Sequence, residues 1–214
     1  MSNHCSHSDR RGKLVLVLGG VRSGKSRFGQ DLASDLGDDT VLFVATAEAR
    51  DYEMTRRIDK HRLSRPSTWQ TLEQPLGVGN AILQLGADRI GPVILLDCLT
   101  LLVSNVVLQE PSDPDAVEQQ MRAELDALIQ VVEQHETTLI IVSGEVGMGV
   151  VPETMIGRLF RDLLGWSNQY LAARASATYF MLAGLPVNAT SLATTSKLAA
   201  MTLKKSIHAS GVSA

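Results

Sequence analysis

Short apolar runs alternate with longer polar stretches along most of the chain. Apolar runs rich in Val, Ile and Leu predict strands at 13–18, 40–45, 93–97, 138–143 and 178–183, with a shorter strand at 68–72. Both faces of the first run are apolar, which is typical of a central parallel strand. The intervening stretches predict helices at 25–36, 51–63, 75–85, 99–108, 115–135 and 154–175, the last bent or interrupted near Gly165. This alternation predicts βαβ units and a mainly parallel sheet.

The composition of the chain changes at both ends of this pattern. Residues 1–12 are rich in Ser, His and Arg and predict a disordered N-terminal tail. After Val187 the sequence shifts to Ser, Thr, Ala and Lys, and 188–214 reads as a C-terminal extension without chemistry of its own. The core domain is therefore expected at 13–187.

A phosphate-binding motif follows the first strand directly. The sequence GGVRSGKS matches G-x4-G-K-[ST], with a strand before it and a helix after it. Its glycines allow backbone N–H groups to surround an anion, and the helix adds its positive N-terminus. The motif predicts a P-loop NTPase three-layer α/β fold of the RecA-like kind, with nucleotide contacts from Gly19, Gly20, Val21, Arg22, Ser23, Gly24, Lys25 and Ser26.

Two residues of this region are candidates to hold Mg²⁺. Ser26 occupies the hydroxyl position of the motif, which ligates Mg²⁺ in P-loop proteins, while Lys25 reaches the β- and γ-phosphates. Asp97 ends the strand at 93–97, where P-loop proteins carry a second acidic residue near the metal. The alternative interpretation of Asp97 is an N-cap for the following helix.

Composition and missing motifs narrow the class of nucleotide-binding protein. A net charge of −3 and 4% aromatic residues argue against a nucleic-acid partner. No apolar run approaches the roughly 20 residues of a membrane span, and the two cysteines fit a reducing cytoplasm. The chain has no N-K-x-D motif, and Asp97 begins no D-x-x-G motif, so a GTPase switch is disfavoured. A small-molecule kinase or transferase, or a nucleotide-dependent regulatory protein, remains.

A densely charged segment carries a possible nucleophile. On the helix expected at 51–63, His61 shares one face with Met54 and Ile58. Imidazole attacks phosphorus well at neutral pH, and the surrounding cations attract phosphate: Arg57, Lys60, Arg62 and Arg65. From this chemistry alone, His61 is either a half-buried structural histidine or a catalytic nucleophile.

Several segments together resemble one enzyme family. They are GGVRSGKS, VATAEARDYEM, RIDKHRLSRPSTWQTLE, ILLDCLTLLVSN, VSGEVGMGVVPE and GRLFRDLLGWSNQYLA. They look like the bifunctional adenosylcobinamide kinase / adenosylcobinamide-phosphate guanylyltransferase of cobalamin biosynthesis, and the resemblance covers about 13–187.

The resemblance implies two reactions and two catalytic residues. The enzyme would phosphorylate adenosylcobinamide with ATP or GTP and then transfer GMP from GTP through a GMP-histidine intermediate. The matching histidine is His61, and Lys25 would act on the triphosphate. Some members carry two adjacent histidines, whereas here Lys60 precedes His61. A homotrimer whose neighbouring subunits complete the site is also implied.

The resemblance extends the expected nucleotide site beyond the phosphate loop. Glu73 and Asp97 match positions that contact the guanine nucleotide, and either carboxylate suits guanine or Mg²⁺. The glycine-rich loop at 144–152 gives Glu145 either an active-site role or a role in a rigid turn. Arg158 and Arg161 either lie near phosphate or form surface ion pairs. The further nucleotide-binding residues implied are Val44, Ala45, Thr46, Arg62, Leu63, Ser64, Arg65, Glu73 and Asp97.

Overall fold

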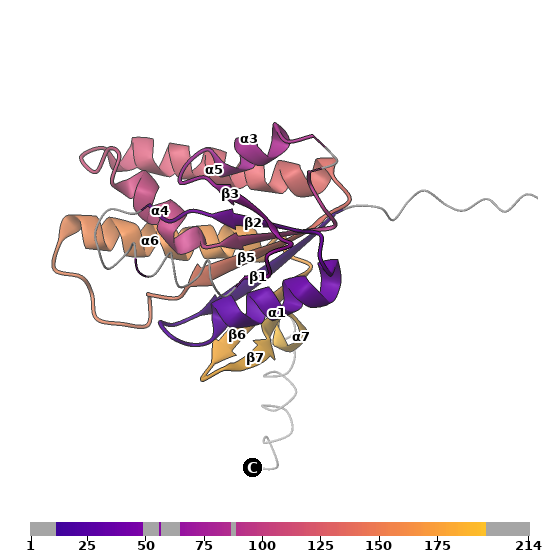
Figure 1. Ribbon diagram of the computed structural model, residues 1–214. Coiled ribbons are helices and arrows are strands. Elements are labelled where there is room, and N and C mark those ends of the chain that lie inside the picture. The colour runs from indigo at the N-terminus through magenta and orange to yellow at the C-terminus, as the bar shows by residue number, and fades with distance from the viewer. Residues whose placement is uncertain (1–11, 49–55, 57–64, 87–88, 196–214) are drawn as a thin grey trace, which may run out of the picture.

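The computed structural model describes residues 12–48, 56, 65–86 and 89–195 (Figure 1). The strands are β1 (Lys13–Gly19), β2 (Val41–Ala45), β3 (Gln70–Glu73), β4 (Val93–Asp97), β5 (Thr138–Gly144), β6 (Ala177–Leu182) and β7 (Leu185–Asn188). The helices are α1 (Lys25–Gly37), α3 (Val78–Leu83), α4 (Leu99–Val107), α5 (Pro114–Gln134), α6 (Met155–Ala172) and α7 (Ala189–Leu192). Most of the expected tail at 1–12, and all but Arg56 of the helix expected at 51–63, lie outside the described residues.

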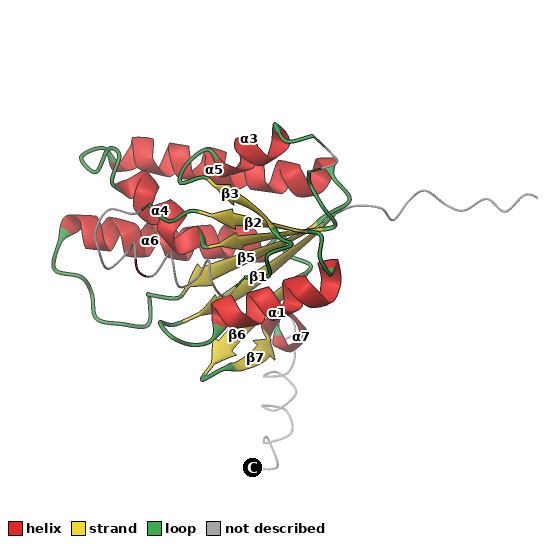
Figure 2. Ribbon diagram, in the orientation of Figure 1, coloured by secondary structure: helices red, strands yellow, loops and turns green. Residues whose placement is uncertain are grey.

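The seven strands form one sheet in the order β3-β2-β4-β5-β1-β6-β7. Every neighbouring pair is parallel except β6 and β7. The α/β fold with a mainly parallel sheet is therefore confirmed. Since parallel strands all end at the same edge, the segments that directly follow β1, β3, β4 and β5 lie on one side of the molecule (Figure 2).

Two apolar cores lie on opposite faces of the sheet. Along each strand the side chains alternate between the two faces. Leu14 and Leu16 of β1 face the core that also contains α3, α4, α5 and α6, whereas Val15 and Val17 face α1. Figure 1 shows the same three layers, with α1 on one side of the sheet and α3 to α6 on the other.

The sequence prediction was wrong in three places. Helix α6 continues through Gly165 without interruption, and α3 begins at Val78 rather than near Pro75. The hairpin strand β7 was not predicted, and its last residue, Asn188, lies inside the expected extension at 188–214. The turn of this hairpin, Ala183-Gly184, has positive φ at both residues. It lacks the Asn-Gly or Asp-Gly signal that announces such turns in a sequence.

Two glycines provide a matched test of the packing between helices. A Cβ atom built on Gly79 of α3 lies 2.5 Å from the carbonyl carbon of Ala127 in α5, whereas one on Gly165 of α6 meets nothing within 4 Å. We expect Gly79→Ala to lower the free energy of unfolding by about 1–3 kcal/mol. Gly165→Ala should raise it by about 0.5–1 kcal/mol, because alanine favours helix. Urea unfolding of both variants measures this, and equal shifts would contradict the packing described.

Candidate active site

Most of the predicted nucleotide residues that the structure describes lie at the carboxyl edge of the sheet. Ala45 of β2 lies in register with Glu73 on one side and with Asp97 on the other. Gly19 at the end of β1 lies in register with Gly144 at the end of β5. Ligands of open parallel sheets bind outside this edge.

The phosphate loop adopts an anion-binding shape. Arg22 and Gly24 have φ values of 57° and 92°, and α1 begins immediately afterwards. Successive backbone conformations of this kind point N–H groups toward a common centre, and the helix N-terminus adds positive charge. The Lys25 ammonium donates a hydrogen bond of 3.0 Å to the Gly20 carbonyl, which holds the lysine across the loop. The contiguous motif therefore has the backbone shape expected of a phosphate-binding loop.

The β6–β7 hairpin braces this loop, a contact that the sequence did not indicate. The N–H of Gly184 in the hairpin turn donates to the carbonyl of Ser23 at 3.0 Å. A Cβ atom on Gly24 would lie only 3.3 Å from the Cα of Gly184. Glycine is thus required at position 24 both by its positive φ and by the close approach of the hairpin.

Ser26 and Asp97, the two candidates to hold Mg²⁺, lie within hydrogen-bonding distance of each other. The Ser26 hydroxyl donates to Oδ1 of Asp97 at 3.4 Å, although 71 positions separate the two residues. The N-cap residue of α4 is Cys98, so the alternative interpretation of Asp97 as that N-cap is wrong. Hydroxyl and carboxylate oxygens are the hard donors that Mg²⁺ prefers, so this pair fits the metal.

A buried hydroxyl joins the ends of β2 and β4. The Thr46 hydroxyl donates to the carbonyl of Cys98 at 2.7 Å and accepts from the Cys98 N–H at 3.1 Å. The side chains of Val44 and Thr46 are fully buried. Neither of these two predicted residues therefore exposes surface at the edge where the nucleotide is expected.

Cys98 is a protected thiol next to this site. Burial, and then the neighbouring Asp97 carboxylate, raise the pKa of Cys98 to about 11. The thiol is therefore neutral at physiological pH and is a poor nucleophile. Cys98 forms no disulfide bond within the described part of the chain.

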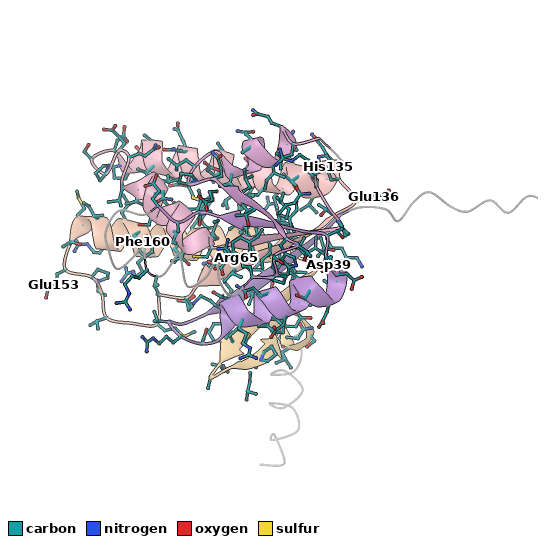
Figure 3. The ribbon with its side chains drawn as sticks, in the orientation of Figure 1. Asp39, Arg65, His135, Glu136, Glu153 and Phe160 are labelled. Atoms are coloured by element: carbon teal, nitrogen blue, oxygen red, sulfur yellow. The ribbon has the colours of Figure 1, made fainter. Side chains whose placement is uncertain are left out.

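Glu73 and Arg65 lie farther from the phosphate loop. Glu73 ends β3 and is exposed, two strands away from Asp97 across β2. The Arg65 guanidinium lies 3.5 Å from the ring centroid of Phe43, on the α1 side of the sheet (Figure 3). The remaining predicted residues, His61, Arg62, Leu63 and Ser64, lie outside the described residues.

The loop after β5 contacts the base of the phosphate loop. The Glu145 N–H donates to the carbonyl of Gly19 at 3.0 Å, and the Glu145 carboxylate accepts from the N–H of Gly147. These bonds match the rigid-turn interpretation of Glu145. Arg158 donates to the carbonyls of Pro152 and Glu153, and so closes the far end of the same loop.

Arg161 forms the surface ion pair that the sequence left as one alternative. Its guanidinium lies 2.9 Å from the carboxylate of the adjacent Asp162. The Asp162 side chain is largely exposed, so solvent screens the pair and it adds little stability.

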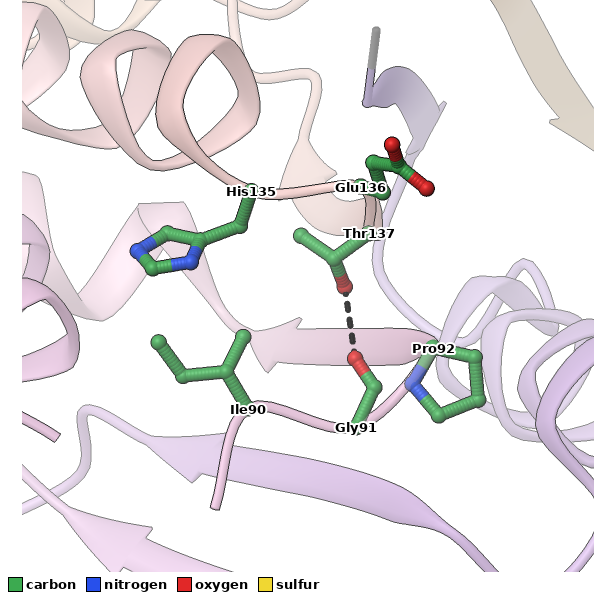
Figure 4. A pocket seen from close by; sticks show the side chains of 6 residues that line it. All are labelled: Ile90, Gly91, Pro92, His135, Glu136 and Thr137. Carbon is green, nitrogen blue, oxygen red and sulfur yellow. Dashed lines mark hydrogen bonds between the residues drawn. The ribbon is translucent and has the colours of Figure 1, made fainter. Parts of the chain in front are cut away.

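A separate pocket lies at the amino edge of the sheet, away from the phosphate loop. It has a volume of about 310 Å³, and Figure 4 shows the Thr137 hydroxyl bonded to the Gly91 carbonyl within it, at 2.9 Å. None of the predicted nucleotide residues lines it; the lining residues are Ile90, Gly91, Pro92, His135, Glu136 and Thr137. In Figure 3, His135 and Glu136 lie at the opposite end of the molecule from Glu153 of the loop after β5.

In the described part of the chain, no helix combines the length and apolar character needed to cross a membrane.

Comparison with known proteins identifies the family. Residues 15–189 match the family model described as cobinamide kinase / cobinamide phosphate guanyltransferase (CobU). The bifunctional adenosylcobalamin biosynthesis protein CobP of Pseudomonas aeruginosa is 42% identical over 172 residues, 80% of this chain and 94% of CobP. The corresponding CobU of Escherichia coli is 39% identical over 183 residues, 81% of this chain and 98% of CobU.

A solved structure is also similar. The RadB recombinase superimposes with a TM-score of 0.48 at 14% identity, covering 79% of this chain and 74% of RadB.

The family model spans nearly the whole core, including the phosphate loop and the carboxyl edge described above. The chain therefore belongs to the cobinamide kinase / cobinamide phosphate guanyltransferase family of bifunctional enzymes.

Proposed function

We propose that this chain phosphorylates the aminopropanol hydroxyl of adenosylcobinamide with ATP or GTP, and then transfers GMP from GTP to the new phosphate. The products of the second reaction are adenosylcobinamide-GDP and pyrophosphate. The observation that carries the proposal is the meeting of Ser26 with Asp97 beside a folded phosphate loop, in a chain of this family. We place both reactions in the cytoplasm.

The first reaction uses the phosphate loop. The substrate hydroxyl attacks the γ-phosphorus, the bond to the nucleoside diphosphate breaks, and the hydroxyl proton is lost. Backbone N–H groups of residues 19–26 and the Lys25 ammonium hold the β- and γ-phosphates and stabilise the charge that builds up on them. Ser26 and Asp97 would hold Mg²⁺, which neutralises phosphate charge when bound.

The second reaction uses His61 as the nucleophile. The imidazole attacks the α-phosphorus of GTP and pyrophosphate leaves, giving GMP bonded to His61. A phosphate oxygen of adenosylcobinamide phosphate then attacks the same phosphorus and restores the imidazole. Arg62 and Arg65 are the cations placed by the motif to neutralise charge on that phosphorus, and Leu63 and Ser64 lie between them in sequence. The R-I-x-x-H-R segment supports this assignment.

Glu73 is the proposed reader of guanine. A carboxylate accepts hydrogen bonds from the ring N–H and the exocyclic amine of guanine together. Glu73 is exposed at the end of β3, whereas Asp97 already contacts Ser26. In this proposal Asp97 binds the metal ion and Glu73 binds the guanine base.

We propose a homotrimer whose subunits meet near the site. Several large apolar side chains around the carboxyl edge are exposed, Val21 by 89% and Val150 by 95%, together with Met148, Val151 and Met155. Four of these side chains lie on the phosphate loop and the loop after β5, and Met155 begins α6. Exposed apolar groups gathered in this way are typical of a surface that a partner covers. Light scattering of the purified protein measures the mass, and a monomer at micromolar concentration would contradict this part of the proposal.

The metal assignment predicts a specific change in Mg²⁺ dependence. Asp97→Asn removes the charge that would bind the ion, so the Mg²⁺ concentration for half-maximal kinase rate should rise about tenfold or more. Asp39→Asn is the matched control, because Asp39 accepts a bond from Thr68 at the other end of the molecule (Figure 3). Titration of Mg²⁺ at fixed ATP measures both, and a parallel shift in the two variants would contradict the assignment.

A two-step product assay tests the function as a whole. Adenosylcobinamide with ATP and Mg²⁺ should yield its phosphate, and addition of GTP should convert the phosphate to adenosylcobinamide-GDP with release of pyrophosphate. Accumulation of the phosphate without any GDP product would indicate a small-molecule kinase only. Nucleotide binding without either product would instead indicate a regulatory protein.

A further inference from the structure

We infer that Asn105 is a positioning residue that fixes the Glu73 segment against the rest of the nucleotide site. Asn105 lies on α4, is only 5% exposed, and has no assigned part in either reaction. The inference rests on the proposed function, because it concerns the orientation of the proposed guanine reader.

Asn105 bonds to two strand ends with one amide group. Its Nδ2 atom donates to the Thr46 carbonyl at 2.9 Å and to the Pro75 carbonyl at 3.1 Å. Thr46 directly follows β2, and Pro75 lies two residues after Glu73. A carboxamide has two N–H donors, so a single side chain satisfies both carbonyls.

Other bonds extend this connection across the site. The Gln74 N–H donates to the carbonyl of Ala45 at 2.8 Å. The segment after Glu73 is therefore bonded directly to β2, and Asn105 links it to Thr46 as well. The Thr46 hydroxyl bonds the N–H and carbonyl of Cys98, directly after Asp97. Each of the two site carboxylates therefore precedes a residue that is hydrogen-bonded to the end of β2, and Asn105 holds that end in place.

The surroundings of Asn105 indicate that its role is to link the Thr46 and Pro75 carbonyls rather than to fill the core. The helix sequence is LTLLVSNVV, and the side chains of Leu102, Val103, Val106 and Val107 are fully buried around the asparagine. An apolar residue would pack there without desolvation cost, whereas a buried amide is retained only where it finds partners. The two carbonyls that accept from this amide are backbone groups beside the site.

The test compares Asn105→Leu with a matched control. Thr137→Val removes a similar bond from a buried side chain to a backbone carbonyl, at 2.9 Å to Gly91, at the opposite edge of the sheet. Dissociation constants for GTP and for ITP, which lacks the exocyclic amine, are measured by calorimetry with Mg²⁺. The same measurement is made on Glu73→Gln, and on Asn105→Ser if Asn105→Leu does not fold.

We expect Asn105→Leu to weaken GTP binding roughly tenfold and to lower the preference for GTP over ITP, as Glu73→Gln does. Thr137→Val should leave both values unchanged, and Asn105→Ser, which keeps one donor, should fall between Asn105→Leu and wild type. Wild-type GTP affinity in the Asn105 variants, or an equal loss in Thr137→Val, would overturn the inference. If Glu73→Gln leaves the GTP/ITP ratio unchanged, the proposed role of Glu73 fails, and the GTP affinity of the Asn105 variants alone decides the inference.

Discussion

Lys25→Ala is expected to lower kcat/KM of the kinase step by about 10²–10³, the usual effect of removing one preorganised donor from a developing charge. The Lys25 ammonium lies across the phosphate loop, 3.0 Å from the Gly20 carbonyl. From there its charge can move onto the β- and γ-phosphates with little reorganisation. Initial rates of adenosylcobinamide phosphate formation with ATP measure the effect.

Arg27→Ala is the control for Lys25→Ala. Arg27 carries the same charge two residues later on α1, but its side chain is 88% exposed and lies 3.8 Å from Asp31 one helical turn away. Its removal should change the kinase rate by less than about twofold, since exposed pairs contribute little. Equal losses in the two variants would mean that general charge, rather than the cradle geometry, sets the rate.

His61→Ala is expected to abolish guanylyl transfer, by a factor on the order of 10⁴ or more, while the kinase step continues. Without the imidazole no covalent GMP intermediate forms, whereas the γ-phosphoryl transfer uses the phosphate loop. Separate assays of adenosylcobinamide phosphate and adenosylcobinamide-GDP measure the two steps.

His135→Ala is the control for His61→Ala. His135 lines the pocket at the amino edge of the sheet (Figure 4), so its removal should leave both steps unchanged. A His61→Ala enzyme that still forms adenosylcobinamide-GDP at a rate near that of wild type would show that another group carries GMP. Loss of both steps together would point to a folding defect.

The sequence predicted the parts of the site that depend on contiguous signals. A phosphate loop combines the end of a strand, a glycine-rich turn and the start of a helix within one motif. The sequence GGVRSGKS therefore predicted the local backbone geometry that the structure shows. Asp97 was a candidate because it is an acidic residue at the end of an apolar strand. Parallel pairing then brought that residue to the same edge as Ser26.

The parts that the sequence did not predict depend on contacts between distant segments. The bond from Gly184 to Ser23 requires a hairpin whose turn, Ala183-Gly184, carries no standard sequence signal. In the sequence, Asn105 is a polar residue in a mostly apolar helix, with nothing to mark its role. The two carbonyls that accept from it lie 59 and 30 positions away. Hydrogen-bond partners of buried polar groups are not encoded in local periodicity.

Two further expectations concern Gly165 and Glu145. Gly165 was expected to bend or interrupt α6, but the helix continues through it without interruption. Glu145 was left between a catalytic and a structural role, and its carboxylate bonds the N–H of Gly147 within its own loop. Glu145→Gln is therefore expected to retain both activities.

The mass of the intact protein after incubation with GTP and Mg²⁺ tests the proposed chemistry most directly. We predict a GMP-sized addition that is released by acid, as expected of a phosphoramidate, and that is absent from His61→Ala. A folded wild-type protein that binds GTP but gains no mass, or a His61→Ala protein that gains the same mass, would contradict the proposed intermediate.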